Sequence, residues 1–217
     1  MKKCIIVGAG DFYGIHDSIE EYDFVIAADG GFEHLLHFGV VPDLLIGDMD
    51  SIKNKDWSSL IQPEKTTCIQ LPTEKDDTDM LAAIKEGLKR GCTEFAIYGA
   101  LGGRIDHSLA NIQCLCYLCE QHARGIIYGE HDSLELLCNE RRIYPATCKG
   151  MISVFAFGGT AKGVTEEGLK YGLQDTEVTV GKPIGVSNEF IGQESMIEVK
   201  DGMLLVYLHE ACVSYNR

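Results

Sequence analysis

The feature that most constrains this chain is an alternation of short apolar runs with longer amphipathic segments, from Lys3 to about Tyr128. The apolar runs have the length of strands, and the segments between them have helical periodicity. The runs are residues 4–7, 24–27, 44–46, 67–71, 95–98 and 125–128, and the helical segments are 32–38, 77–90 and 105–122. This rhythm predicts an α/β fold with a parallel, Rossmann-like sheet covered by helices on both faces.

The pattern changes after about Asp132 to short β-type runs separated by turn residues such as Gly158, Gly159 and the pair Asp201-Gly202. These runs are residues 134–137, 152–157, 177–180, 196–199 and 204–208. They predict a small all-β sandwich. We therefore expect two domains, an α/β domain over residues 1–137 and a β-sandwich over residues 138–217.

Composition narrows the class of protein. With 45% hydrophobic and 24% charged residues, the 217-residue chain reads as a globular protein. A net charge of -14 argues against nucleic acid as a partner, because phosphate-binding surfaces need clustered Lys and Arg. No stretch approaches the length of a membrane span. Nine scattered cysteines fit reduced thiols, so we expect a cytoplasmic protein with no structural disulfide.

Four of the predicted parallel strands are followed by polar loops. The loops are residues 28–31, 47–51, 74–79 and 99–107. In an open parallel sheet, ligands bind in the crevice beyond the carboxyl ends of the strands. The chemistry of this chain is therefore expected at one edge of the sheet.

Aspartates dominate two of these loops. Asp48 and Asp50 are two residues apart, so in an extended segment both carboxylates project to one side and can hold a hard cation such as Mg²⁺. Asp76 and Asp79 share one face of a helix start. Alternatively, Asp76 or Asp77 caps its helix, and residues 47–51 form an ordinary turn. The presence of both loops after strands of one sheet favours the metal site.

Gly102, Gly103 and Arg104 open the third helical segment. Free backbone amides and a guanidinium at a helix N-terminus suit an anion, and glycines let a phosphate approach the backbone. The alternative is a plain loop with a surface arginine.

Taken together, these motifs resemble the thiamine pyrophosphokinase family of bacterial type. The matching blocks are AADGG at 27–31, PDLLIGDMDSI at 42–52, EKDDTDM at 74–80, GGRIDH at 102–107 and GVSNEF at 185–190. They span most of the chain in the family's order. The resemblance implies an α/β domain that binds ATP and Mg²⁺, a β-sandwich that binds thiamine and dimerises, and a homodimer with its active site at the subunit interface.

The resemblance also implies roles for individual residues. The implied metal ligands are Asp29, Asp48, Asp50 and Asp79, and the implied catalytic residues are Asp48, Asp50, Asp76, Asp79, Arg104 and Asp106. Those implied to bind ATP are Asp29, Gly30, Gly31, Lys75, Thr78, Gly102, Gly103, Arg104 and His107. Those implied to bind thiamine are Asp106, Tyr171, Ser187 and Asn188. The stretch Gly168-Leu169-Lys170-Tyr171 resembles a family segment that more often ends in Trp in animal members.

The implied reaction is an attack by the hydroxyl of thiamine on the β-phosphorus of ATP, which releases AMP. Asp106 and Asp76 are both candidates for the proton acceptor. Two other functions fit the same residues. A magnesium-dependent phosphohydrolase would use water in place of the alcohol, and a non-catalytic sensor would bind a nucleotide or thiamine without turnover.

Overall fold

The computed structural model describes residues 1–16, 18–54 and 56–211 and divides into two compact units, Met1–Glu130 and His131–Arg217. The division therefore falls after Glu130 rather than after residue 137. Strand β7, Asp132–Cys138, accounts for the difference. It pairs antiparallel with β14, Met203–His209, over its whole length and so belongs to the second unit.

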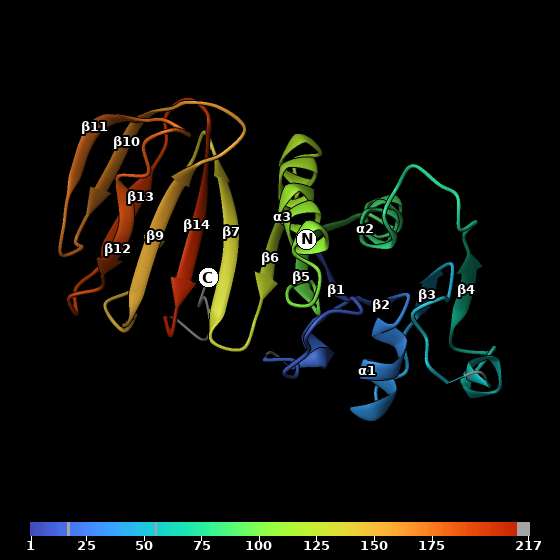
Figure 1. Cartoon of the computed structure of the whole chain (residues 1–217). Helices are drawn as coiled ribbons and strands as arrows, with labels where there is room; N and C mark the ends of the chain where they lie inside the picture. The colour runs from blue at the N-terminus through green and yellow to red at the C-terminus, as the bar shows by residue number, and fades with distance from the viewer. Residues whose placement is uncertain (17, 55, 212–217) are drawn as a thin grey trace. The chain divides into compact units, whose positions relative to one another are not determined.

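The first unit contains a sheet in the order β6-β5-β1-β2-β3-β4, and all five neighbouring pairs are parallel (Figure 1). Its strands are β1 Lys2–Val7, β2 Phe24–Ala28, β3 Leu44–Gly47, β4 Thr67–Gln70, β5 Cys92–Tyr98 and β6 Arg124–Tyr128. The expected apolar runs all became strands of this sheet. The central strands β1, β2, β3 and β5 are buried along most of their length, which their continuous apolar sequence requires.

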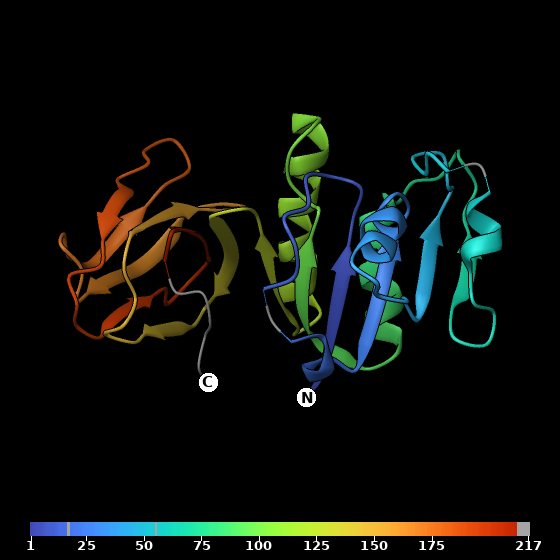
Figure 2. The ribbon, with the colours of Figure 1, turned by 90° about the horizontal axis from the view of Figure 1, so that it is seen from below.

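Helices lie on both faces of this sheet. They are α1 Gly31–His37, α2 Asp79–Lys89 and α3 Ile105–Glu120, with short 3₁₀ turns at Ile19–Glu21 and Trp57–Leu60. Phe32 of α1 packs in one cluster with Ile5 and Val7 of β1. A Cβ on Gly87 of α2 would lie 3.5 Å from Sγ of Cys4, whose side chain points to the other face of β1. The two helices thus cover opposite faces (Figure 2).

The order of the strands places the crevice of this sheet. The chain runs from β1 outward to β4 and then returns to β5 on the other side of β1. The loops after β1 and β5 therefore lie together, and the amide of Gly10 donates to the carbonyl of Gly99 at 2.8 Å. A Cβ on Gly10 would lie 2.4 Å from the carbonyl oxygen of Leu101, so this close approach of two loops requires glycine. Such a switch point is where open α/β sheets bind ligands.

The second unit holds two antiparallel groups of strands, β12-β9-β14-β7 and β11-β10-β13-β8. The strands not yet given are β8 Arg141–Tyr144, β9 Met151–Ala156, β10 Ala161–Glu167, β11 Leu173–Val178, β12 Gly185–Glu189 and β13 Ser195–Glu198. Val154 and Val206 of one group and Val164 and Ile197 of the other are fully buried in a common core. Strands β8, β10 and β12 are absent from the sequence expectation, since each carries charged or glycine residues among few apolar ones.

Seven cysteines in the described part of the chain are free thiols. Cys148 is disulfide-bonded, so the expectation of no structural disulfide is wrong for this residue. No helix among the described residues is both long and apolar enough to cross a bilayer.

Candidate active site

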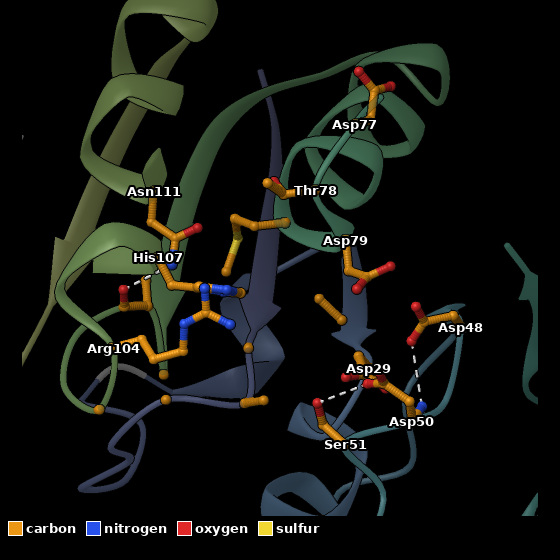
Figure 3. A pocket seen from close by; sticks show the side chains of 18 of the residues that line it. Asp29, Asp48, Asp50, Ser51, Asp77, Thr78, Asp79, Arg104, His107 and Asn111 are labelled. Atoms are coloured by element: carbon orange, nitrogen blue, oxygen red, sulfur yellow. Dashed lines mark hydrogen bonds between the residues drawn. The ribbon is translucent and has the colours of Figure 1, made fainter. Parts of the chain in front are cut away.

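A cavity of about 520 Å³ lies in the first unit, at the carboxyl ends of its strands. Its walls come from the loops after β1, β2, β3 and β5 and from the beginnings of α2 and α3 (Figure 3). The structure brings ten of the expected site residues into this one lining. They are Asp29, Asp48, Asp50, Lys75, Thr78, Asp79, Gly102, Gly103, Arg104 and His107.

Three carboxylates converge on one side of the cavity. Oxygens of Asp29, Asp48 and Asp50 all lie within 4.8 Å of one another (Figure 3). Asp29 is only 5% exposed, and its Oδ1 is buried without a hydrogen-bond partner among the described residues. Burial, together with the charges of Asp48 and Asp50, raises the pKa of Asp29. Carboxylate oxygens at this spacing, one of them unsatisfied, fit a hard divalent cation.

The backbone brings Asp48 and Asp50 together in a way that differs from the sequence expectation. The residue between them, Met49, has a φ of 66°, so the segment is a left-handed turn and not an extended run. Gly47, which ends β3, permits a second close approach. A Cβ at Gly47 would lie 2.9 Å from the Cβ of Asp29, closer than side chains pack. The aspartates converge, but the expected extended geometry is wrong.

Lys75 links two of the acidic residues. Its Nζ lies 3.1 Å from Oδ2 of Asp48 and 3.1 Å from Oδ1 of Asp79, with all three side chains at least three-quarters buried. Burial by itself would raise the pKa of Asp48. The hydrogen bond and charge of Lys75, together with the hydrogen bond from the backbone of Asp50, have the larger effect and hold this pKa below its usual value. Burial dominates at Asp79 and raises its pKa. The ammonium of Lys75 thus partly balances the acidic cluster.

The start of α2 differs from both interpretations of its aspartates. Thr78 is the N-cap, and its hydroxyl accepts the amide of Leu81 at 3.2 Å. Asp77 instead pairs with Lys85 across 2.6 Å. Asp76 precedes the helix, so it does not share a helical face with Asp79. It is also not part of the cavity lining. The expectation that Asp76 or Asp77 caps the helix is wrong.

Arg104 lies on the opposite side of the cavity from the aspartates (Figure 3). It is the residue before α3, and its Nη2 pairs with Oδ2 of Asp106 at 2.6 Å while its Nε donates to Oδ1 at 3.1 Å. Both side chains are well exposed. The hydrogen bond from Arg104 lowers the pKa of Asp106. Asp106 itself does not line the cavity, so only the guanidinium of this pair faces it.

Gly30 and Gly31 serve packing in this structure. A Cβ on Gly31 would lie 1.9 Å from the carbonyl oxygen of Val7, and one on Gly30 would lie 2.9 Å from the Cβ of Ala9. Neither glycine lines the cavity. They allow the N-terminus of α1 to pack tightly against the end of β1.

Of the four expected thiamine residues, Asp106 lies in the first unit and the other three lie in the second. Tyr171 is 61% exposed, and Ser187 is also exposed, with a φ of 61° and an amide that donates to Ser153 Oγ at 2.9 Å. Asn188, in contrast, is buried at 4% exposure. The two exposed side chains are available to a ligand, whereas Asn188 is enclosed by its own unit.

Sequence reasoning left four polar residues of the cavity out of the expected site, and they are Ser51, Thr73, Asp77 and Asn111. Asn111 lines the cavity from α3, and its Nδ2 donates to the carbonyl of Ala100 at 2.7 Å. The signal was present, because Asn111 follows His107 by four residues and so lies on the same face of the helix.

Comparison with known proteins decides the family. Residues 15–128 match the family model for the thiamin pyrophosphokinase catalytic domain, and residues 140–204 match the model for the thiamin pyrophosphokinase vitamin B1 binding domain. The chain belongs to the thiamin pyrophosphokinase family. The expected family and enzyme class, an ATP-dependent diphosphotransferase, are thereby confirmed.

Individual members of the thiamin pyrophosphokinase family are similar along nearly the whole chain. Thiamine pyrophosphokinase of Bacillus subtilis is 28% identical over 210 residues, which cover 95% of this chain and 98% of that protein. The crystal structure of Bacillus subtilis thiamine pyrophosphokinase superposes with a TM-score of 0.85 at 26% identity, over 96% of this chain and 99% of the other. The crystal structure of a thiamin pyrophosphokinase family protein from Enterococcus faecalis superposes with a TM-score of 0.83 at 28% identity, over 96% of this chain and 99% of the other.

Proposed function

We propose that this chain transfers the β,γ-diphosphate of ATP to the hydroxyl of thiamine, with Mg²⁺ held by Asp29, Asp48, Asp50 and Asp79. One observation carries the proposal. The converging carboxylates of Asp29, Asp48 and Asp50 and the guanidinium of Arg104 line the same cavity from opposite sides (Figure 3). A cavity with cation ligands on one wall and a fixed cation on the other suits a polyphosphate.

The metal would be held first by the three converging aspartates. The unsatisfied Oδ1 of buried Asp29 supports this assignment, since a buried carboxylate oxygen without a partner costs stability unless a cation or a donor reaches it. Asp79 faces the same cavity and shares Lys75 with Asp48, which makes it the fourth candidate ligand. When bound, Mg²⁺ would neutralise charge that develops on the phosphate oxygens.

Of the residues implied to bind ATP, all except Gly30 and Gly31 line the cavity around this group. Gly102 and Gly103 have φ values of 86° and 61°. A Cβ on Gly102 would lie 2.0 Å from Oδ2 of Asp11, whereas one on Gly103 would meet nothing within 4 Å, so the backbone at Gly103 is open to a phosphate. Arg104 would bind the transferring phosphates. Lys75, Thr78 and His107 complete the set.

In the proposed reaction, the hydroxyl oxygen of thiamine attacks the β-phosphorus of ATP. The bond from that phosphorus to the oxygen bridging it to the α-phosphorus breaks, and AMP leaves with the electron pair. Arg104 would stabilise charge on the β- and γ-oxygens, which is the main source of catalysis in such transfers. Asp106 or Asp76 would take the proton of the hydroxyl. In this structure Asp106 is paired with Arg104, and breaking that pair would make it the stronger base.

In the second unit, the exposed side chains of Tyr171 and Ser187 would contact thiamine, while the buried amide of Asn188 holds the backbone of Tyr171. The first unit would be a Rossmann-like catalytic domain. We propose a homodimer whose active site lies at the subunit interface. Exposed apolar side chains on the second unit support an interface there, and they are Tyr171, Ile184, Val186 and Ile191. A cytoplasmic location fits the supply of ATP and the seven free thiols.

The metal assignment is tested by activity before and after chelation. EDTA should abolish formation of thiamine diphosphate, and added Mg²⁺ should restore it. Asp50→Ala should lower kcat by at least about a hundredfold without a change in the thermal transition, because the side chain is exposed. The control Asp201→Ala removes an exposed carboxylate in the second unit. A near-normal rate for Asp50→Ala would exclude the metal site.

A further inference from the structure

Lys75 is a buried cation in the wall of the cavity. Its side chain is only 15% exposed, and its Nζ lies 3.1 Å from Oδ2 of Asp48 and 3.1 Å from Oδ1 of Asp79. These two carboxylates belong to the loop after β3 and to the first turn of α2 (Figure 3). A lysine this far from solvent needs paired charges. The ammonium is therefore fixed between two carboxylates.

The ammonium leaves room on both carboxylates for a metal ion. It pairs with Oδ2 of Asp48, whose Oδ1 accepts the backbone amide of Asp50 at 3.3 Å, and with Oδ1 of Asp79. An ionised carboxylate has two oxygens and about four lone-pair sites, so each of the two keeps acceptor capacity. Lys75 thus shares the proposed metal ligands with a metal ion and does not block them.

Asp48 belongs to two groups of charges at once. One group is formed by Asp29, Asp48 and Asp50, whose oxygens lie within 4.8 Å of one another, and it does not include Asp79. In this group the buried Oδ1 of Asp29 has no hydrogen-bond partner among the described residues, so a cation would satisfy it. The other group is the ammonium of Lys75 with Asp48 and Asp79. Asp48 therefore lies between the proposed position of Mg²⁺ and a fixed positive charge.

Two neighbouring positive charges are also the arrangement of two-metal phosphate enzymes. In those sites, two divalent cations about 3.5–4 Å apart stabilise the attacking and the leaving oxygens of the phosphate group. In this cavity the second positive charge belongs to a side chain of the protein. An ammonium held at that position repels a divalent cation that approaches it.

We propose that the ammonium of Lys75 takes the place of a second divalent cation, so that each chain binds one Mg²⁺ and Lys75 supplies the other positive charge beside the phosphates. This inference rests on the proposed function, and within it on the proposed metal site. It adds the number of ions that the cavity takes and the physical reason for that number.

A simple counter-ion would make the same contacts, and removal of the ammonium distinguishes the two roles. If Lys75 were only a counter-ion, its removal would make the single metal ion bind more tightly, and no further ion would bind. If Lys75 replaces a second metal, its removal frees oxygens of Asp48 and Asp79 for a second ion. The number of bound ions is thus the deciding quantity.

Binding of Mn²⁺ to the full-length protein without nucleotide gives this number, because the electron paramagnetic resonance signal measures the free ion. Wild-type protein should bind one Mn²⁺ per chain, and Lys75→Ala should bind two. Lys75→Ala/Asp79→Asn should bind one again, because the second position loses a ligand. The control Lys89→Ala breaks a pair with Glu86 outside the cavity lining and should bind one. Two ions in the wild type, or one in Lys75→Ala, would overturn the proposal.

Thermal unfolding supplies a second measurement and guards against a loss of folding. Lys75→Met keeps the apolar part of the side chain and should also bind two Mn²⁺. Saturating Mg²⁺ should raise the thermal transition of Lys75→Met more than that of the wild type, because two ions in place of one then stabilise the folded state. An equal rise for both proteins would overturn the proposal as well.

This inference and the proposed function fail in different ways. A wild type that makes thiamine diphosphate and binds two Mn²⁺ would keep the function and overturn the role of Lys75. A wild type that binds one Mn²⁺ but makes no thiamine diphosphate would overturn the proposed function. Absence of any bound Mn²⁺ would exclude the metal site and, with it, this inference.

Discussion

Nζ of Lys75 lies 3.1 Å from Oδ2 of Asp48, and the same ammonium reaches a second carboxylate on α2. The ammonium of Lys75 thus links Asp48, in the loop after β3, with Asp79, the first residue of α2. Since both carboxylates are proposed metal ligands, the position of this ammonium sets the charge with which the cavity receives MgATP.

Replacing Lys75 should therefore weaken nucleotide binding specifically. We expect Lys75→Gln to raise the KM for ATP by about tenfold, because the variant lacks a buried cation beside the phosphates. The KM for thiamine should stay unchanged. Steady-state kinetics with each substrate varied in turn measure both constants. Lys89→Gln is the control, since Lys89 pairs with Glu86 within α2 and neither residue lines the cavity. Equal effects of the two variants would contradict the role given to Lys75.

Arg104 should matter for rate far more than for stability. Its side chain is 73% exposed and its partner Asp106 is 63% exposed, so this ion pair contributes little to folding. We expect Arg104→Gln to lower kcat by about a hundredfold or more, because charge on the transferring phosphates loses its fixed counter-charge. The thermal transition should stay within about 1 °C of the wild type. A variant that unfolds early but turns over normally once folded would reverse this assignment.

The sequence predicted which loops form this site, but it did not predict the backbone geometry within those loops. Apolar strands followed by polar loops were enough to place Asp29, Asp48 and Arg104 at one edge of one sheet. The local geometry was not accessible in the same way. The residue type gives no signal for the positive φ of Met49, because methionine rarely adopts the left-handed conformation. Thr78 is a preferred N-cap residue type, but the aspartates beside it drew the expectation away from it.

Other features depended on contacts between segments distant in sequence. Lys75 binds Asp48 across 27 residues, and no spacing rule indicates such a pair. Strand β12 was missed because its pairing with β9 shifts register between Gly185 and Asn188, which breaks the alternation that marks a strand. The family resemblance implied that Asn188 binds thiamine, and the structure places its side chain in the interior of the second unit.

The first unit should be sensitive to a single methyl group at Gly31. A Cβ there would lie 1.9 Å from the backbone carbonyl oxygen of Val7, and the strand cannot move away because it lies in the centre of the sheet. We expect Gly31→Ala to destabilise the protein by about 2 kcal/mol or more in urea unfolding. Gly159→Ala, where a Cβ would meet nothing within 4 Å, is the control. Equal midpoints for the two variants would argue against this packing.

The second unit should lose a stabilising ion pair as the pH rises. Nδ1 of His209 lies 2.7 Å from Oδ1 of Asp132, and this hydrogen bond raises the pKa of His209 above 6.5. The folded state therefore binds the proton more tightly than the unfolded state. The added stability is complete below pH 6.5 and disappears as the pH passes the raised pKa.

Asp132→Asn should remove this dependence, because the neutral amide no longer favours the imidazolium. Thermal unfolding of both proteins from about pH 5.5 to about pH 8.5 measures it. The wild-type transition should exceed that of the variant most at the acidic end, with the difference shrinking toward the basic end. A difference that stayed constant across the range would mean that the contact is an ordinary hydrogen bond without a protonated His209.

The most direct test of the account follows the phosphorus atoms. Wild-type protein is incubated with Mg²⁺, thiamine and ATP labelled at its β-phosphorus, and the labelled products are separated. Transfer of a diphosphate predicts that the label moves entirely into thiamine diphosphate, with an equal amount of unlabelled AMP. Label in ADP, or in inorganic phosphate or diphosphate without thiamine diphosphate, would contradict attack by thiamine on the β-phosphorus and replace it with another phosphate reaction.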